Sequence, residues 1–297
     1  MSLAKLLVKG QDWELIRDRL GFADGPCSDA RGNLYFSDMR KSAVGPGIFR
    51  VGLDGEVTKL LSEAASGLMF GPDGRLYACQ GREKRIAAID VKTGSITTVV
   101  SNVQPNDLVV SAQGRIYFTE TRKKQVTMFD LSTGSKRGVD SGITAPNGIA
   151  LSADGESLAV SDFRGEHVWI FRVEKDGTLK FKEPFMTMRT RVDPDVVSPQ
   201  GTGPVYRKSC RGDGMTSDLQ GRWYVATELG VQFFDASGRI SGVIPHPGPK
   251  GITSVGLSGT DRSYLTITQG DTVYRRKVQA NGALYHLKDG GALPGSK

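Results

Sequence analysis

Residues 106–120 read N-D-L-V-V-S-A-Q-G-R-I-Y-F-T-E, and a similar stretch occurs six times along the chain. In each copy a polar residue precedes a short apolar run, a turn follows, and a second strand-like run ends near another polar residue. The residues at the first position, which we call the anchors, are Asp24, Ser66, Asn106, Asn147, Asp213 and Thr253. Successive anchors lie 42, 40, 41, 66 and 40 residues apart. A period near 41 residues is the length of one four-stranded propeller blade.

The remainder of each repeat completes a four-stranded unit. After two strand-like runs at 108–111 and 115–119, residues 126–130 have the pattern of a third strand and residues 135–139 that of a fourth, at the edge. We therefore predict an all-β fold, a six-bladed β-propeller with four-stranded antiparallel blades that occupies residues 1–297 as a single domain.

Two segments lie outside the repeat. Trp13–Ile16 is expected to form a strand that closes the ring against the last blade, which removes an exposed sheet edge. The long spacing between Asn147 and Asp213 places an insertion at 182–209, which carries several Pro and Gly residues. We interpret it as an inserted loop between blades, either a solvated excursion or a lid over a pocket.

Composition narrows the classes of function. Net charge is +7, but the basic residues are spread, and the densest cluster, Arg122-Lys123-Lys124, is interpreted as a solvated turn, so no nucleic-acid partner is predicted. The three His and three Cys residues are too scattered for a zinc site of Cys and His ligands. No apolar run is long enough to span a membrane and no signal peptide is recognised. We expect a cytoplasmic protein, or a periplasmic one if a natural leader has been removed.

The anchors suggest a shared ion site, because repeats arranged in a ring bring equivalent residues together. Each Asn or Asp taken alone has the pattern of an ordinary turn. Together, two carboxylates and two amides at equivalent positions supply oxygen ligands, which suit Ca²⁺, Mg²⁺ or Mn²⁺. We predict one divalent ion, with Zn²⁺ as a further candidate, held by Asp24, Asn106, Asn147 and Asp213.

The ordered motifs resemble the gluconolactonase, regucalcin and senescence-marker-protein family. Asp24-Gly25-Pro26 resembles its E-G-P motif, Asn106-Asp107 its N-D block, Pro146-Asn147-Gly148 its P-N-G block and Asp213-Gly214-Met215 its D-G-M block. The resemblance covers nearly the whole chain. It implies a propeller with one ion, usually calcium, held by the four residues above, and hydrolysis of aldonolactone-like esters with the ion polarising the carbonyl at the mouth of the central channel.

This chain departs from the family pattern around the predicted site. Asp24 stands where the family usually has Glu, and Gln104 stands where mammalian members have Arg. Asp213 is our candidate for the general base or nucleophile, because a carboxylate at the rim could reach a water molecule or the carbonyl carbon. The residues predicted to contact a small lactone or ester substrate are Ser66, Gln104, Glu120, Asp162 and Thr253.

Two other functions stay open from the sequence. A related branch, which resembles diisopropyl fluorophosphatase, hydrolyses organophosphates at a similar site. A propeller that binds a ligand or protein without catalysis is the third alternative, since a fold does not determine an activity. The sequence leaves the oligomeric state open.

Overall fold

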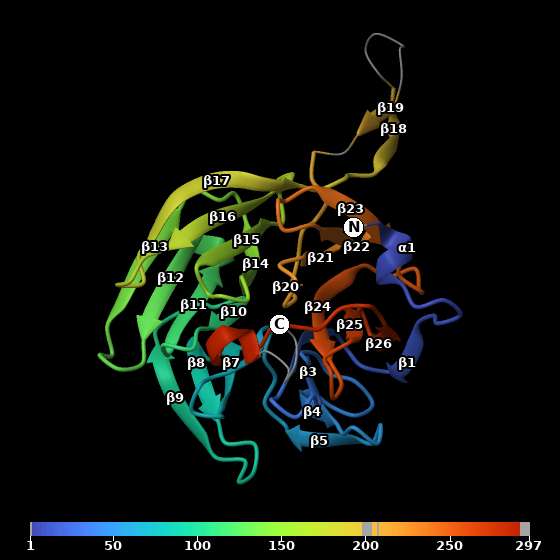
Figure 1. The fold of residues 1–297 in the computed structure, drawn as a ribbon. Coiled ribbons are helices and arrows are strands. Elements are labelled where there is room, and N and C mark those ends of the chain that lie inside the picture. Colours follow the sequence, from blue (N-terminus) through green and yellow to red (C-terminus); the bar gives the residue numbers. More distant parts are fainter. Residues whose placement is uncertain (1, 198–203, 207, 292–297) are drawn as a thin grey trace.

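The computed structural model describes residues 2–197, 204–206 and 208–291. Six four-stranded antiparallel sheets are arranged around a central axis, as Figure 1 shows, and the predicted six-bladed β-propeller is confirmed. The strands of the first three blades are β2 (Ala23–Ser28), β3 (Leu34–Asp38), β4 (Gly47–Val51), β5 (Val57–Leu61), β6 (Leu68–Phe70), β7 (Leu76–Gln80), β8 (Arg85–Ile89), β9 (Ile96–Ser101), β10 (Leu108–Val110), β11 (Arg115–Glu120), β12 (Gln125–Asp130) and β13 (Lys136–Ser141).

The other three blades repeat this plan, and each follows the strand order of the chain except at the ring closure. Their strands are β14 (Pro146–Leu151), β15 (Ser157–Asp162), β16 (His167–Val173), β17 (Leu179–Thr187), β20 (Met215–Ser217), β21 (Trp223–Thr227), β22 (Gly230–Phe234), β23 (Ile240–Ile244), β24 (Ile252–Ser258), β25 (Tyr264–Gln269) and β26 (Thr272–Lys277). The first strand of every blade is the innermost one, as β10, β14, β20 and β24 show near the axis in Figure 1.

The third blade shows how the sequence produces this arrangement. The short strand β10 is buried on both faces, so it is apolar throughout instead of alternating. Gly114 adopts a φ of +76° in the turn after it, and β11 then returns with Ile116 opposite Val110. Side chains from β10 and β11 pack against those of β7 and β8 in one buried cluster. The core therefore lies between neighbouring blades, and each blade needs its neighbours to bury its faces.

The ring is closed by the N-terminal strand β1 (Glu14–Arg17), which pairs with β26, so the predicted closure is confirmed. An ion pair between Glu14 and Arg275, at 2.9 Å, lies across this pairing. Ahead of it, the short helix α1 (Leu3–Leu6) buries Leu6 against the fifth and sixth blades. Two distant parts of the chain therefore share the last blade.

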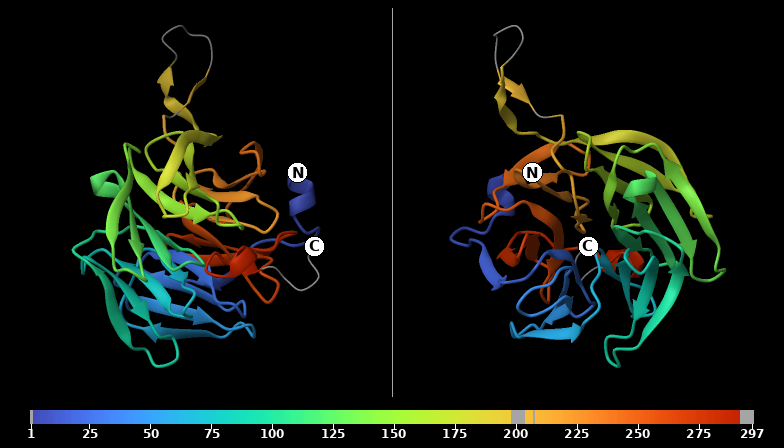
Figure 2. Two further views of the ribbon diagram at one scale, coloured as in Figure 1. Left: turned by 60° about the vertical axis from the view of Figure 1, so that its left-hand side comes forward. Right: turned by 180° about the vertical axis from the view of Figure 1, so that it is seen from behind.

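The insertion differs from the predicted loop at its start. Residues 182–187 belong to β17, the outer strand of the fourth blade, which pairs with β16 and buries Met186 completely. Pro184 made this segment look like a loop, but an edge strand tolerates Pro because it has no outer partner. Beyond it, β18 (Val192–Val197) and β19 (Pro204–Tyr206) pair with each other and stand away from the disc in Figures 1 and 2.

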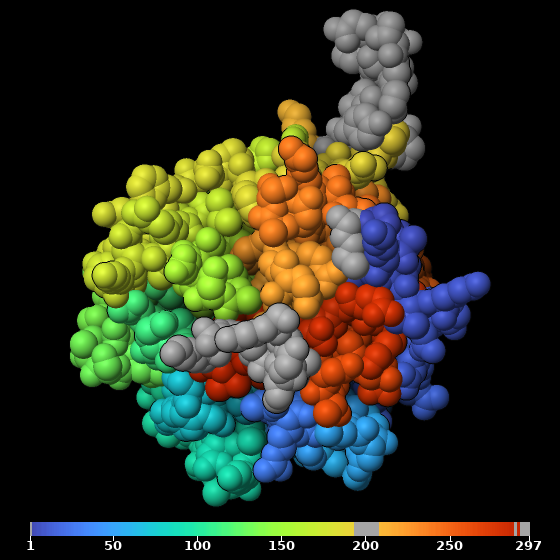
Figure 3. All heavy atoms as spheres, in the orientation of Figure 1, coloured from blue at the N-terminus to red at the C-terminus, as the bar shows by residue number. Residues whose placement is uncertain are grey.

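The C-terminal segment covers the opposite end of the axial channel from the anchors. Tyr285 accepts a hydrogen bond from the backbone N–H of Ser217 at 2.7 Å, at the far end of β20. The 3₁₀ helix η2 (Lys288–Gly291) follows and lies near the centre of the disc in Figure 1; a second one, η1 (Thr121–Lys123), lies between β11 and β12. In the described part of the chain no helix is long and apolar enough to cross a membrane. Figure 3 shows the space-filled surface from this side.

Candidate functional site

All six anchors lie at the start of an innermost strand. Asp24, Asn147 and Thr253 are the second residues of β2, β14 and β24, and the other three lie two residues before β6, β10 and β20. Because the innermost strands run in the same direction along the axis, the anchors share one face of the disc. The predicted ring of equivalent positions is therefore present.

Hydroxyl groups join these positions from blade to blade. Each donates a hydrogen bond to a backbone carbonyl at the start of the next innermost strand, over 2.5–2.8 Å. The pairs are Ser66 to Asn106, Thr119 to Asn147, Ser161 to Asp213, and Thr253 to Ala23. Ser66 and Thr253, two of the predicted substrate contacts, thus use their hydroxyl groups to hold the ring together.

Glycines directly after the anchors allow the innermost strands to approach each other closely. A Cβ atom at Gly148 would lie 2.2 Å from the carbonyl oxygen of Asp213, and one at Gly214 would lie 2.0 Å from Ser254 Oγ. These distances are shorter than van der Waals contact. The glycines that seemed to belong to ordinary turns are therefore required by the packing of the blades around the axis.

We expect Gly148→Ala to lower the free energy of unfolding by about 1–3 kcal/mol, the usual cost of overpacking. The added methyl group must displace the Asp213 backbone, so activity should fall as well. Gly251→Ala is the matched control, because a Cβ there meets no atom within 4 Å; its stability should stay within about 0.5 kcal/mol of the original. Equal urea-denaturation midpoints for the two variants would show that the innermost strands at Gly148 and Asp213 can move apart without a loss of stability.

Three carboxyl groups lie close enough to interact at the axial opening. Burial raises the pKa of Asp213, and the negative charges of Asp24 and Asp107 raise it further. The pKa of Asp24 is raised by burial and then by Asp107. The Asn147 side chain donates a hydrogen bond to Asp213, which opposes the rise. The structure thus brings Asp24, Asn147 and Asp213 together, and Asn106 adjoins the third carboxylate.

Asp107 is a buried carboxylate of this group that the sequence pattern did not single out. Burial raises its pKa to about 7, although the backbone N–H groups of Leu108 and Ile149 donate hydrogen bonds that lower it. The signal was present in the repeat, because the residue after the anchor is Gly in four blades and Asp only in the third. Its Oδ1 atom occupies space beside Gly67, where a Cβ would lie 2.5 Å away. Glycine in one blade therefore makes room for a carboxylate from the next.

This donor set fits a hard divalent cation. None of the groups that act on the pKa values of Asp24, Asp107 and Asp213 is a cation, so their charges have no counter-charge among the described residues. Carboxylate and amide oxygens are the ligands that Ca²⁺ and Mg²⁺ prefer. No group of three or more His, Cys, Asp and Glu residues in the described chain is arranged to hold a metal. An ion here would depend on the two Asn side chains.

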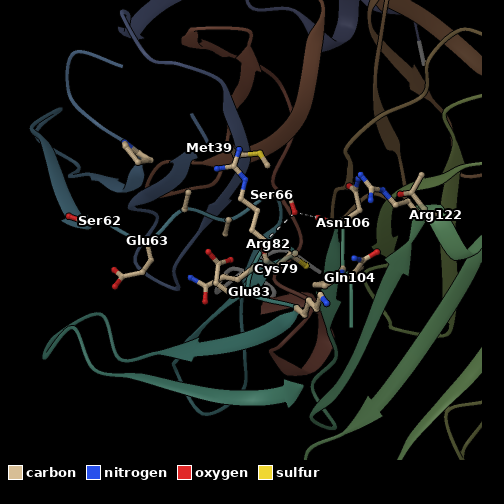
Figure 4. Close-up of a pocket in the computed structure, with 18 residues that line it drawn as sticks. Met39, Ser62, Glu63, Ser66, Cys79, Arg82, Glu83, Gln104, Asn106 and Arg122 are labelled. Carbon is tan, nitrogen blue, oxygen red and sulfur yellow. Dashed lines mark hydrogen bonds between the residues drawn. The ribbon is translucent and has the colours of Figure 1, made fainter. Parts of the chain in front are cut away.

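A cavity of about 750 Å³ opens beside Asn106, over the first three blades (Figure 4). Its walls come from five parts of the anchor face: residues 39 and 46, 62–66, 79–84, 104–106 and 121–122. Ser66 and Gln104 line it as predicted substrate contacts should, whereas Glu120, Asp162 and Thr253 do not. Cys79 also lines it, and like the other two thiols, Cys27 and Cys210, it is buried and not in a disulfide.

Glu120 and Asp162 instead hold the loops that lead into their blades. Glu120 accepts a hydrogen bond from the Gln104 N–H, and Asp162 accepts one from the Ala145 N–H at 2.9 Å. Burial alone would raise the pKa of Glu120, but hydrogen bonds from Lys123, Gln104 and Thr127 bring it below the ordinary value. The structure gives no support to the prediction that Glu120 and Asp162 contact a substrate, and it stays a prediction.

In the second blade the corner side chain makes no such hydrogen bond to the loop that leads into the blade. Gln80 occupies the equivalent corner, and its Oε1 accepts a hydrogen bond from Arg85 Nε at 2.7 Å. Its Nε2 is buried without a partner, and within the described chain it makes no hydrogen bond to the loop at 62–65. Gln269, at the corner of the sixth blade, does bind its loop, through the carbonyls of Gly248 and Lys250. The cavity therefore opens beside a loop that the corner side chain of its own blade does not bind, although the Ala65 N–H of this loop donates a hydrogen bond to Ser37 of the first blade.

The fold and the axial ring of oxygen donors define a six-bladed propeller with a polar site on one face. The chain belongs to the SMP-30/Gluconolactonase/LRE-like family, which it matches over residues 22–271. It is 26% identical over 265 residues to a gluconolactonase of Zymomonas mobilis, across 78% of this chain and 71% of that protein.

Solved structures show the same fold. A gluconolactonase from Xanthomonas campestris has a TM-score of 0.76 at 24% identity, covering 93% of this chain and 92% of its own. Regucalcin from Agrobacterium tumefaciens, a calcium-binding protein, has a TM-score of 0.72 at 17% identity, covering 93% and 98%. These two likenesses support the propeller fold and carry no further weight for the activity.

Proposed function

We propose that the protein is a lactone hydrolase that depends on a divalent ion, with calcium the first candidate. The observation that carries the proposal is the group of three carboxylates without a counter-charge, beside a cavity and within a chain of the gluconolactonase family. Asp24, Asn106, Asn147 and Asp213 would hold the ion, which when bound supplies a Lewis acid for the ester carbonyl.

The residues of the chain have separable roles in this proposal. Asn106 belongs both to the ring and to the cavity wall, so it would orient the ester between them. Asp213, whose carboxylate is hydrogen-bonded to Asn147, is the candidate general base that removes a proton from water, or the nucleophile at the carbonyl carbon. The buried innermost strands limit access of bulk water to the carboxylates from below.

The test is a panel of γ- and δ-lactones assayed by proton release with Ca²⁺, Mg²⁺, Mn²⁺ or Zn²⁺, and again after chelation. We expect hydrolysis of at least one lactone that chelation removes and one of these ions restores. Diisopropyl fluorophosphate is assayed in parallel. Turnover of the fluorophosphate alone would replace this proposal with a phosphotriesterase, and no turnover of either would favour a propeller that only binds ligands.

A further inference from the structure

The cavity beside Asn106 carries basic side chains that the ring of carboxylates does not explain. Arg82 and Lys84 come from the turn between β7 and β8, and Arg122 comes from η1 after β11. Arg122 lies in an exposed turn, as the sequence predicts, and it also borders the cavity. In the view of Figure 4, Ser66 and Asn106 lie between Arg82 and Arg122. Positive charge thus flanks the part of the cavity that adjoins the anchor ring.

These cations differ from the basic residues next to them in sequence. Lys123 forms an ion pair with Glu120 at 2.7 Å, and Arg85 donates to Gln80, so both serve the packing of their blades. The side chains of Arg82, Lys84 and Arg122 make no ion pair, hydrogen bond or ring contact with any described residue. They are exposed on the cavity side and available to a ligand.

The cavity also contains a buried donor without an acceptor. Gln80 is only 1% exposed, its Oε1 is occupied by Arg85, and its Nε2 has no partner. An unpaired buried N–H group costs free energy, which a ligand acceptor or a shift of the adjoining loop would recover. Glu63 and Glu83 line the cavity too, but in Figure 4 Arg82 stands between them and Asn106.

The distribution of charge would orient a substrate. When all three are ionised, Asp24, Asp107 and Asp213 outnumber the two charges of the proposed ion by one, so an anionic group gains more from the arginines at the cavity wall than from the axial opening. An ester carbonyl on the same molecule could then face Asn106 and the ring. Arginine suits this task, since its guanidinium group forms paired hydrogen bonds with a carboxylate or a phosphate.

We propose that the preferred substrate is a lactone that carries an anionic substituent, and that Arg82 and Arg122 bind this substituent. The inference rests on the proposed lactone hydrolysis and adds the class of substrate. Both a carboxylate and a phosphate have the required chemistry. Arg82 and Arg122 are specificity-determining residues in this scheme, and Asp213 remains the group that acts at the ester.

The experiment compares three lactones that differ in one substituent: glucono-δ-lactone, a glucarolactone with a free carboxylate, and 6-phosphogluconolactone. We expect the KM of one anionic lactone to be about 10-fold below that of the neutral one, the effect of a charged hydrogen bond. Whichever anionic lactone is preferred identifies the substituent. In Arg82→Gln and Arg122→Gln the KM for that lactone should rise by about the same factor, while its kcat and both constants for the neutral lactone stay within about twofold.

Lys124→Gln is the matched control, because it removes a cation from the turn that holds Arg122 without altering the cavity wall. It should leave all three KM values unchanged, and the thermal midpoints of all three variants should match the parent. Equal KM values for neutral and anionic lactones, or arginine variants that behave like Lys124→Gln, would overturn this inference and leave lactone hydrolysis intact. Failure to hydrolyse any lactone would overturn the proposed function, and this inference with it.

Discussion

Asp213→Asn should lower kcat for lactone hydrolysis by about 10²–10⁴-fold, the usual contribution of a general base. The variant keeps the size of the side chain and an oxygen that can accept the hydrogen bond from Asn147. It also leaves the hydrogen bond from Ser161 to the backbone carbonyl at 213 in place. The site should therefore stay assembled while it loses the group that accepts a proton. Steady-state kinetics and calorimetric titration with Ca²⁺ measure the two effects separately.

Asp24→Asn is the matched comparison, because Asp24 lies in the same carboxylate group but is assigned no proton transfer. We expect it to weaken ion binding, with kcat recovering at saturating ion. Asp213→Asn should instead keep its defect in kcat when the ion is saturating, and its Kd for the ion should rise by a smaller factor than kcat falls. If the losses of activity and of ion affinity are equal in Asp213→Asn, Asp213 has no separate chemical role.

The arrangement of the ring was predictable because the blades are related by pseudo-symmetry. A repeat of about 41 residues specifies blades, and blades place equivalent residues at one end of the axis. For this reason alone, Asp24 and Asp213 could be predicted to lie close together although 189 positions separate them in the sequence. The closure of the ring by residues near Trp13 followed from the need to cover an open sheet edge.

What could not be predicted lies where the blades differ from one another. The cavity depends on the second blade having Gln80 where the first, third and fourth blades have acidic corner residues that hold their loops. The role of Asp107 depends on the space left by Gly67 of another blade. Arg122 and Lys123 are adjacent in sequence, yet one lines a cavity and the other pairs with Glu120. Contacts of this kind require the relative positions of neighbouring blades, which a repeat period does not give.

The carboxylate group makes the stability of the ion-free protein depend on pH in a specific direction. Asp107 has a pKa of about 7 in the folded protein, against about 3.9 for Asp in an unfolded chain. The folded state therefore binds this proton more tightly, so its contribution to stability is complete below about pH 4 and is lost as pH rises towards 7. Carboxylates with lowered pKa values, such as Asp90 and Asp176, act in the opposite direction but at more acidic pH.

A divalent ion should reverse this loss, because it competes with protons for the same oxygens. With chelator present, the thermal midpoint should decrease as the pH is raised from 5 to 8. At about 100 times its Kd the ion should add about 2.7 kcal/mol, or roughly 4–5 °C for a chain of this size. The gain should be larger at pH 8 than at pH 5. Differential scanning fluorimetry across this range, with Ca²⁺ and with chelator, measures both trends.

Asp107→Asn separates charge repulsion from other causes, because its oxygen can still accept the hydrogen bond from the Leu108 N–H. Removing one of three like charges should raise the midpoint of the chelated protein at pH 8 and leave it nearly unchanged at pH 5. Asp90→Asn, at an exposed turn away from the axis, should change neither the ion response nor its dependence on pH. A chelated protein whose midpoint is the same at pH 5 and pH 8, and the same in Asp107→Asn, would mean that these carboxylates do not repel one another. The electrostatic argument for a cation at the axial opening would then fail.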